Sequence, residues 1–428
     1  MPVFTSSIEV TADYPTIKPS LNLNFLKARA LDSRVTLERA SAATYIGRDG
    51  LVKYAGEDEP RFDHDPDTLE SLGLLLEESR TNIAIYGDDM SQYTSVNMTK
   101  TANDAVAPDG TTTATKLEHG GGGNTWYLDF TSPTSTPASG AGTYTYSVWV
   151  KAPDDQPDDY YGCKIAILTT TGNNTEVAFP LKKTWSRISV TKTYASETGN
   201  IRIHPIIFRN SPGNSDAGYV MPTHVWVWGS HWEAGSFPTS YIPTNGAAVT
   251  RAADFGYITG DNFSSWFNQS EGSLDVGYRL GYNNALGYDN VYDNFSMRVC
   301  QISNQSANNV IDLVVGSGGG NGGYWFINTG GTQQFSSSSV VNSAQVGADR
   351  NFRSVLAYKE NDCAAQQDKI STITTDTNVT LATDYDRLLF YQIANGGDQI
   401  QGHLKYIRYY PKRITNDQVT QLSQDGNV

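Results

Sequence analysis

Large apolar side chains occupy every second position in several short runs of this sequence. In residues 144–150, Tyr144, Tyr146, Val148 and Val150 alternate with polar residues and one Trp. In residues 225–228 Val alternates with Trp, and residues 388–393 place apolar residues on both faces of a strand. In residues 406–410, Ile407 and Tyr409 alternate with Tyr406, Arg408 and Tyr410. Gly, Pro, Asn and Asp separate the runs. A period of two matches a β-strand, whereas an α-helix repeats every 3.6 residues. The sequence therefore predicts an all-β fold of many short strands and turns.

The composition indicates a folded protein and excludes two classes of partner. Disordered acidic chains contain few aromatic residues, whereas this chain of 428 residues contains 25 Tyr, 15 Phe and 8 Trp. Its 31 basic and 45 acidic residues give a formal net charge of −14. A protein that follows nucleic-acid phosphates, or that docks on an anionic membrane, needs clustered Lys and Arg. We therefore expect no nucleic-acid partner and no membrane partner.

The opening residues and the cysteines indicate where the chain is made. Residues 1–17 lack a basic segment followed by an apolar stretch, so no secretory signal is expected. The longest apolar runs, such as residues 74–76, are too short for membrane insertion. Cys163, Cys300 and Cys363 are odd in number and widely spaced. This arrangement favours reduced thiols in a protein synthesised in a reducing cytoplasm.

The chain falls into a mixed opening part and two strand-rich parts. Residues 1–80 contain few clear strands, and residues 61–67 are typical of a turn because Asp and Pro gather there. Residues 72–78 fit either a strand or a helical turn. Strands and loops follow from about 82 to 245, and again from 258 to 428. One short C-terminal helix is expected, with Thr415 and Gln418 as a capping box.

Residues 225–244, VWVWGSHWEAGSFPTSYIPT, resemble the last strand and exit segment of a carbohydrate-binding-module-like jelly roll of bacteriophage virion proteins. The family pattern is roughly WGxQxExGxFxTSYIPT, from which His231 and Trp232 depart slightly. Residues 144–151, YTYSVWVK, resemble an inner strand of the same module.

Two further regions resemble phage structural proteins. Residues 402–415, GHLKYIRYYPKRIT, are similar to the closing strand and helix entry of concanavalin A-like (laminin-G-like) domains, and residues 357–359 fit that family. Residues 21–82 are similar to the leader that precedes such modules. The marks of this leader are residues 39–45, 59–66 and 73–82.

These resemblances imply a non-enzymatic virion structural protein of the tail-fibre, head-fibre, knob or capsid-decoration type. They imply two antiparallel β-sandwich domains: a carbohydrate-binding-module-like one at 81–257 and a concanavalin A-like one at 258–428. Residues 1–80 would form an N-terminal leader of mixed extended structure that docks on the particle or oligomerises. The expected partners are other capsid or tail proteins, further copies of the chain in a homo-oligomer such as a trimer, and host-surface glycans. The expected location is the virion, after synthesis in the host bacterial cytoplasm.

Exposed aromatic rings are the candidates for sugar binding, because a flat apolar ring can stack on a sugar. Trp325 and Tyr324 follow a Gly-rich turn, and Trp149 lies in the 144–150 run. Packing in the protein core is the alternative role for each Trp.

A loop at residues 154–159 is the candidate for metal binding. Asp154, Asp155, Asp158 and Asp159 bring four carboxylates together, and Ca²⁺ takes six to eight oxygen ligands. The loop lacks the spacing of an EF-hand, so the alternatives are a structural calcium site and a solvated acidic loop. No other cofactor is expected.

The sequence contains no catalytic motif that we can assign. Residues 118–124, EHGGGGN, are similar to the oxyanion loop of lipases, but no G-x-S-x-G string accompanies them. The six His residues form no HExxH motif. No catalytic residue is therefore predicted. A tail-associated polysaccharide depolymerase, acting as a glycoside hydrolase or lyase, remains the alternative to a purely adhesive or structural role.

Overall fold

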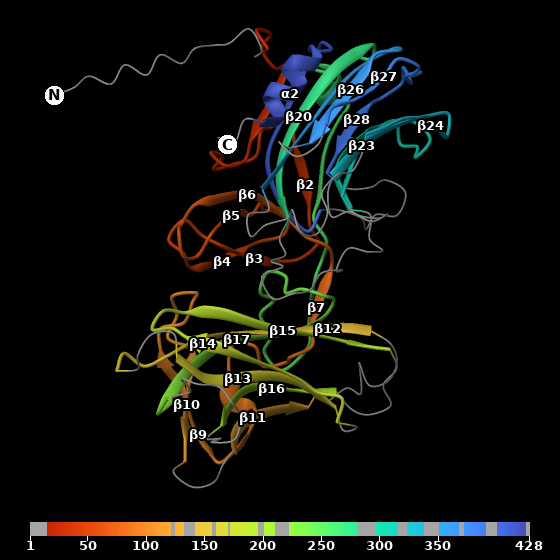
Figure 1. Cartoon of the computed structure of the whole chain (residues 1–428). Helices are drawn as coiled ribbons and strands as arrows, with labels where there is room; N and C mark the ends of the chain where they lie inside the picture. The colour runs from red at the N-terminus through yellow and green to blue at the C-terminus, as the bar shows by residue number, and fades with distance from the viewer. Residues whose placement is uncertain are drawn as a thin grey trace, which may run out of the picture. The chain divides into compact units, whose positions relative to one another are not determined.

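The computed structural model describes residues 15–120, 125–131, 142–155, 160–169, 172–195, 201–209, 222–280, 297–315, 323–337, 351–367, 372–390 and 400–424. In these residues the chain consists mainly of β-strands and turns (Figure 1). The pairings that build the four largest sheets are antiparallel. The predicted all-β class is confirmed.

The chain divides into two compact units, each built from several segments. Unit 1 contains residues 1–39, 58–78 and 253–428, and unit 2 contains residues 40–57 and 79–252. Each unit holds two large antiparallel sheets, as the prediction of two β-sandwiches requires. Segments of the predicted leader, residues 1–80, belong to both units.

Unit 1 contains an eight-stranded and a seven-stranded sheet. The first has the order β27 (Thr374–Asp376), β26 (Cys363–Gln367), β25 (Asn351–Lys359), β20 (Glu271–Leu280), β29 (Gly402–Tyr410), β6 (Ser71–Leu76) and β5 (Phe62–His64), and β1 (Leu21–Asn24) also pairs with β29. The second has the order β2 (Thr36–Glu38), β19 (Phe255–Thr259), β28 (Arg387–Leu389), β21 (Met297–Ser303), β22 (Val310–Val315), β23 (Gly323–Thr329) and β24 (Thr332–Ser336).

The two sheets of unit 1 pack against each other, and a helix covers part of one outer surface. A side chain at Gly323 of β23 would collide with the Tyr278 hydroxyl of β20, so strands of opposite sheets approach closely. Helix α2 (Asn416–Gln424) places Val419 and Leu422 on β25 and β26. Its capping box is formed, because the Thr415 amide donates to Gln418 Oε1 and the Gln418 amide donates to Thr415 Oγ1. The predicted C-terminal helix is confirmed. A short helix, α1 (Asp261–Ser264), was not predicted.

Unit 2 contains two five-stranded sheets. One has the order β15 (Ser186–Tyr194), β12 (Gly142–Lys151), β17 (His224–Ala234), β10 (Ala114–His119) and β9 (Met98–Ala105). The other has the order β14 (Thr175–Leu181), β13 (Tyr160–Thr169), β16 (Ile201–Arg209), β11 (Thr125–Thr131) and β8 (Thr94–Val96). The smaller elements are β3 (Ala43–Ile46), β4 (Val52–Ala55), β7 (Arg80–Asn82), β18 (Val249–Arg251) and the 3₁₀-helix η1 (Met90–Gln92).

The core of unit 2 lies between its two sheets. Tyr146, Val148 and Val150 of β12 point into it, as the alternating pattern of residues 144–150 predicts. Side chains of β11, β13, β16 and β17 complete this core. On the opposite surface of β12 and β17, Trp149 and Trp228 form a second apolar cluster with Tyr241 and Val52. Hairpin β3–β4, which contributes Val52, therefore helps to cover that surface.

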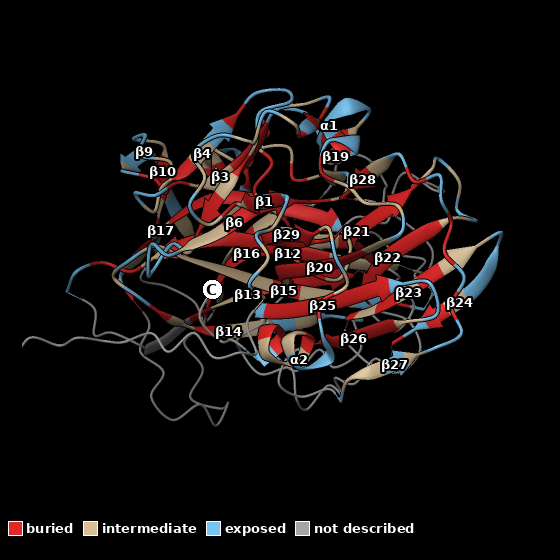
Figure 2. Ribbon diagram, turned by 90° about the horizontal axis from the view of Figure 1, so that it is seen from above, coloured by how far each residue is buried: buried red, intermediate tan, exposed pale blue. Residues whose placement is uncertain are grey.

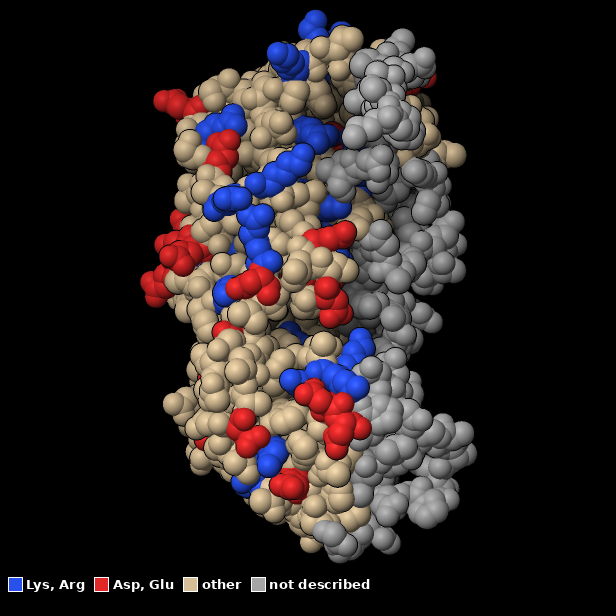
Figure 3. Space-filling model, turned by 90° about the vertical axis from the view of Figure 1, so that its left-hand side faces the viewer, with Lys and Arg blue, Asp and Glu red and all other residues tan. Residues whose placement is uncertain are grey.

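Burial follows the strands, and charged side chains lie on the surface between uncharged ones. Figure 2 shows buried residues along the strands and exposed ones mainly in the connections. Figure 3 shows one face, on which Lys and Arg side chains gather in a band flanked by Asp and Glu.

No helix among the described residues is long and apolar enough to cross a membrane.

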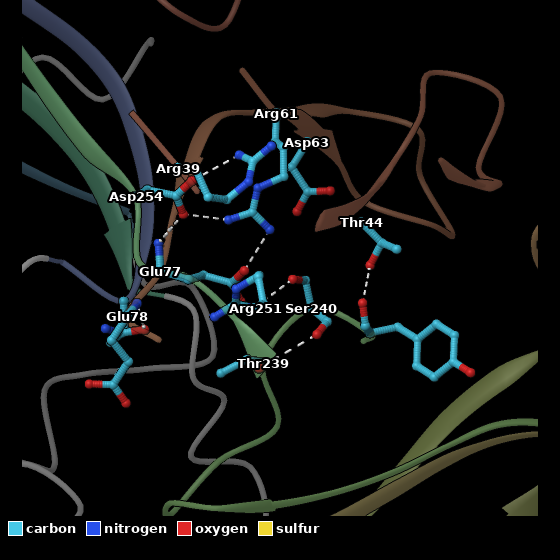
Figure 4. Close-up of polar contacts among 12 residues, drawn as sticks. Arg39, Thr44, Arg61, Asp63, Glu77, Glu78, Thr239, Ser240, Arg251 and Asp254 are labelled. Atoms are coloured by element: carbon cyan, nitrogen blue, oxygen red, sulfur yellow. Dashed lines mark hydrogen bonds and ion pairs between the residues drawn. The ribbon is translucent and has the colours of Figure 1, made fainter. Parts of the chain in front are cut away.

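A buried cluster of four charged side chains joins distant segments of unit 1 (Figure 4). The Asp254 carboxylate accepts hydrogen bonds from Arg39 Nη1 at 3.0 Å and from Arg61 Nη2 at 2.5 Å. Arg61 Nη1 donates to Glu77 Oε2 at 2.6 Å, and the Glu77 amide donates to Asp254. The side chains of Arg39, Arg61 and Asp254 are fully buried. This cluster holds residues 39, 61 and 77 against the start of β19.

The predicted turn at residues 61–67 needs a correction. Residues 62–64 form strand β5, and Asp63 binds His403 Nε2 at 2.8 Å. The turn follows, where the Asp65 carboxylate accepts hydrogen bonds from the amides of Asp67 and Thr68. Residues 71–76 form strand β6, which settles the strand-or-helix alternative for that run. β6 pairs with β29, which lies about 330 residues later in the sequence, and β5 pairs with β6.

Candidate functional site

One sheet of unit 2 carries a mixed apolar and charged surface opposite its core. Trp126, Leu128 and Phe130 of β11 point into the core of unit 2. Strand alternation therefore turns the intervening residues to the outer surface. Side chains of β11, β13 and β16 form a separate cluster there, which contains Tyr127, Ala166, Leu168 and Ile207. We call this surface the β11–β16 patch: Tyr127, Asp129, Ala166, Leu168, Arg202, His204 and Ile207.

An aromatic pair lies at the centre of the β11–β16 patch. The Tyr127 ring stacks on the His204 imidazole, with ring centroids 4.2 Å apart and planes inclined by 15°. β11 and β16 bring these residues together because they pair antiparallel with an irregularity after Tyr127. The Tyr127 side chain remains partly exposed. The pair therefore presents a flat ring held in a fixed orientation.

Charged groups lie beside this aromatic pair. Asp129 Oδ2 is 3.4 Å from Arg202 Nη1, and Asp129 Oδ1 is 3.6 Å from His204 Nε2. Burial raises the pKa of Asp129, and the Arg202 guanidinium opposes part of this shift. Asp129 Oδ1 is buried and accepts no hydrogen bond in the described structure.

The β11–β16 patch has the features of a surface that binds a saccharide. The apolar side of a sugar ring can stack on Tyr127, while its hydroxyls bond to carboxylate and guanidinium groups. Hydrolysis of a glycosidic bond uses two carboxyl groups that flank the bond. Asp129 instead faces a guanidinium and an imidazole.

The residues predicted to bind sugar do not come together. Trp149 belongs to unit 2, where its ring is buried against Trp228 and Tyr241 with Arg187 over one face. Trp325 belongs to unit 1 and is 1% exposed. Its neighbour Tyr324 lies on the other face of β23 and is partly exposed.

Tyr324 has the most accessible ring of these three residues. It lies beside the Phe326 ring, with centroids 6.2 Å apart. The sugar-binding roles of Trp325, Tyr324 and Trp149 stay predictions, and the burial of the two Trp rings favours Tyr324 among them.

The predicted calcium loop is only partly described. Asp154 and Asp155 are exposed in a turn after β12, and Asp158 and Asp159 lie outside the described residues. Within the described part of the chain, no group of three or more His, Cys, Asp or Glu side chains is arranged to hold a metal ion. Calcium binding at Asp154, Asp155, Asp158 and Asp159 stays a prediction.

The residues of the β11–β16 patch were not predicted from sequence. A local signal exists, because residues 126–130 alternate and place Tyr127 and Asp129 together on the polar side. An aromatic residue on the polar side of a strand is a useful sign of a binding surface. The contact with Arg202 and His204 carries no local signal, because it depends on the pairing of β11 with β16.

Comparisons with known proteins give remote structural likenesses. No protein-family model matches the chain, and no curated protein matches it in sequence. A Ruminococcus gnavus sialidase CBM40, solved with α2,3-sialyllactose, is similar with a TM-score of 0.29 and 10% identity over 38% of this chain and 87% of that one.

Two other similar solved structures come from a phage protein and from a mouse laminin. The CBM2 module of an evolved Dit protein from Lactobacillus casei phage J-1 has a TM-score of 0.26 and 13% identity, over 42% of this chain and 82% of that one. Mouse laminin α1 domains LG4–5 have a TM-score of 0.22 and 8% identity, over 66% and 85%. The structural neighbours are thus carbohydrate-binding modules and a laminin G pair. TM-scores this low carry no argument about the function of this chain.

Proposed function

We propose that this chain is a non-enzymatic structural protein of a phage particle that binds host-surface glycans through the β11–β16 patch. The stacked Tyr127–His204 pair beside Asp129 and Arg202 is the observation that carries glycan binding. It combines the partly exposed Tyr127 ring with a negatively charged carboxylate and a positively charged guanidinium, both of which form hydrogen bonds. This combination suits a neutral or amphipathic saccharide rather than an extended polyanion.

The virion part of the proposal rests on the sequence. The strings at 225–244 and 402–415 resemble those of phage structural proteins. Within the proposal, residues 1–80 dock on capsid or tail proteins, the two sandwiches face outward, and the chain assembles as a homo-oligomer such as a trimer. Closed symmetric association is the usual arrangement for such parts.

Binding of saccharides to the purified full-length chain tests the glycan part. The probes are oligosaccharides released from the host-surface polysaccharide, read by glycan array and then by calorimetry. Replacing Tyr127 by Ala is expected to weaken binding about tenfold, because a stacking contact is lost. Tyr54→Ala is the matched control, because Tyr54 is an exposed tyrosine of unit 2 on hairpin β3–β4. Equal binding by wild type and Tyr127→Ala would exclude the β11–β16 patch as the site.

The non-enzymatic and virion parts have separate tests. Release of reducing ends from intact host polysaccharide would replace the proposal with the depolymerase alternative. Mass spectrometry of purified particles should detect the chain in a fixed number of copies. Its absence from those particles would refute the virion role even if glycan binding were observed.

A further inference from the structure

The outer surface of the eight-stranded sheet in unit 1 carries a group of basic and aromatic side chains. Asp275 of β20 lies opposite Arg408 of β29, and Gly277 lies opposite both Arg353 of β25 and Tyr406 of β29. Residues opposite each other in an antiparallel pair share one face. Val355 and Ala357 share this face and pack under α2, which shows that it is the outer one. We call Asp275, Arg353, Tyr406 and Arg408 the arginine platform.

The contacts of the arginine platform hold its two guanidinium groups in place. Arg353 Nε and Nη2 bind the two Asp275 oxygens, each at 2.8 Å. The Tyr406 hydroxyl donates to Asp275 Oδ1 at 3.2 Å. The guanidinium carbon of Arg408 lies 4.4 Å from the Tyr406 ring centroid. Stacking on an aromatic ring restricts the orientation of a guanidinium and leaves its edge available for hydrogen bonds.

Arg408 is the member of the platform that reaches solvent. Asp275 is fully buried and the Arg353 side chain is 7% exposed, whereas the Arg408 side chain is 24% exposed. Its one hydrogen bond to Asp275, from Nη1, is long at 3.3 Å. A guanidinium carries five N–H donors, and Asp275 accepts from one of those of Arg408. Asp275 is already bound by Arg353 and Tyr406, and it therefore neutralises Arg408 only in part.

Two neighbouring side chains extend this surface. Asn22 of β1 lies opposite Arg408 in the sheet and is exposed. Arg279 lies two residues beyond Gly277 on the same face of β20 and is partly exposed. The surface thus offers two guanidiniums and a carboxamide on a protein whose net charge is −14.

We propose that the arginine platform binds an oxyanion, a carboxylate or a phosphate, carried by a surface glycan. A pre-oriented guanidinium binds such a group through two parallel hydrogen bonds. Asn22 adds a donor beside it, and Arg279 adds a second positive charge along β20. This site is separate from the β11–β16 patch: it belongs to the other unit and selects ligands by charge rather than by stacking. It shares with the proposed function only the assumption that the ligand is a glycan.

Binding of defined probes to the full-length chain tests this inference. The probes are a hexasaccharide of alternating glucuronic acid and N-acetylglucosamine, the same hexasaccharide with its carboxylates reduced to alcohols, and a glycerol phosphate oligomer. Calorimetry at about 0.05 M and about 0.5 M salt measures each affinity, because charge-based attraction weakens with ionic strength. Binding of both charged probes would support recognition of oxyanions in general. Binding of only one would show whether the platform selects a carboxylate or a phosphate. Failure of both, or equal binding of the reduced probe, would overturn the proposal.

Variants locate the binding. Arg408→Gln is expected to weaken binding of the charged probe about tenfold or more, because a charge-assisted pair is lost. Arg279→Gln leaves the contacts of Asp275 intact and is expected to cause a smaller loss of affinity for the charged probe. It therefore tests the surface even if Arg408→Gln disturbs the sheet. Arg34→Gln is the matched control: it removes the same charge from unit 1, at a side chain that pairs with Asp32. Equal losses in Arg408→Gln and Arg34→Gln would show a general charge effect and refute the site.

Two variants distinguish oxyanion binding at the arginine platform from saccharide binding at the β11–β16 patch. Tyr127→Ala should leave binding of the charged probe unchanged, and Arg408→Gln should leave binding of neutral saccharides unchanged. Loss of charged-probe binding in Tyr127→Ala would place that ligand in unit 2 and overturn the assignment to Arg408.

Discussion

Replacement of Asp254 by Asn should strongly destabilise unit 1. Asp254 is the one carboxylate that contacts both Arg39 and Arg61, and it also accepts the Glu77 amide. Burial alone would lower the pKa of Arg61, but Asp254 and Glu77 outweigh this effect and raise it, so Arg61 stays charged. The substitution keeps the shape of the side chain and removes its charge. It therefore removes the negative charge that Arg39 and Arg61 share, while Glu77 still binds Arg61.

The size of the effect follows from these contacts. All three hydrogen bonds lost or weakened end on a carboxylate and are charge-assisted, each with a net contribution of about 1.5–3 kcal/mol. Removing one partner from a buried ion pair costs about 3–5 kcal/mol in total, because the remaining charge is left uncompensated. We expect the free energy of unfolding of unit 1 to fall by about 4 kcal/mol. Since domains are stable by about 5–15 kcal/mol, unit 1 would become marginally stable.

Urea unfolding and hydrogen exchange measure this loss and its location. Tryptophan fluorescence gives the change in unfolding free energy, and exchange followed by mass spectrometry should show lost protection in β5, β6 and β19. Strands β12 and β17 of unit 2 should keep their protection. Asp32→Asn is the matched control: it breaks the half-exposed Arg34–Asp32 pair of the same unit and should cost about 1 kcal/mol or less.

Two results would contradict the expected destabilisation of unit 1. One is a loss below about 1 kcal/mol for Asp254→Asn, which would mean that the buried guanidiniums regain solvent or other partners at little cost. The other is lost exchange protection in unit 2 with unit 1 unchanged.

Three further predictions follow from buried groups. Gly229→Ala should destabilise unit 2 by about 2–3 kcal/mol in thermal unfolding, because Gly229 has a φ of +69° and a Cβ there would lie 2.5 Å from a Trp149 ring carbon; an unchanged melting temperature would contradict this. Burial raises the pKa of Asp312 to about 6, against the attraction of Arg298 and the hydrogen bond from Gln301. Because the folded pKa is raised, the favourable contribution of Asp312 is complete below about pH 4 and is lost as the pH rises through about 6, a change of about 3 kcal/mol. The unfolding free energy of wild type relative to Asp312→Asn should therefore fall across that window, and a flat difference would exclude the effect. The three free thiols, those of Cys163, Cys300 and Cys363, are each buried, and burial raises the pKa of Cys363 to about 12. Iodoacetamide at pH 8 should therefore modify no cysteine of the folded chain and all three after unfolding. Mass spectrometry of the labelled chain measures this difference.

The sequence predicted the elements whose signals are local. Alternation in residues 144–150 matches β12, because each inward residue reaches one continuous core. The capping box at Thr415 and Gln418 predicted helix α2, since its hydrogen bonds span only three residues. Residues 1–80 were expected to contain few clear strands, and residues 72–78 fitted either a strand or a helical turn. β1, β5 and β6 are short and gain their pairing from β29 or from each other.

The candidate sites form where two strands pair, and the pattern of residues along one strand does not show which strand lies beside it. Trp149 lies between Val148 and Val150, and Trp325 lies between Tyr324 and Phe326. Such patterns do not show which Trp rings are buried and which are exposed. Tyr127 meets His204 through one strand pairing, and Arg408 meets Asp275 through another. In each case, residues more than 70 positions apart form the surface. Sequence patterns show which face of a strand a residue occupies, but they do not show its neighbour across the sheet.

The pairing of β1 with β29 affects how the chain folds during synthesis. Leu21 lies opposite Tyr409, so the eight-stranded sheet cannot close until residue 409 has left the ribosome. All segments of unit 2 emerge earlier, by residue 252. Since domains fold as units in the order in which they are translated, unit 2 should mature on the ribosome while the early strands of unit 1 wait unpaired. A nascent chain stalled after about residue 300 would therefore expose those strands to chaperones and to wrong partners.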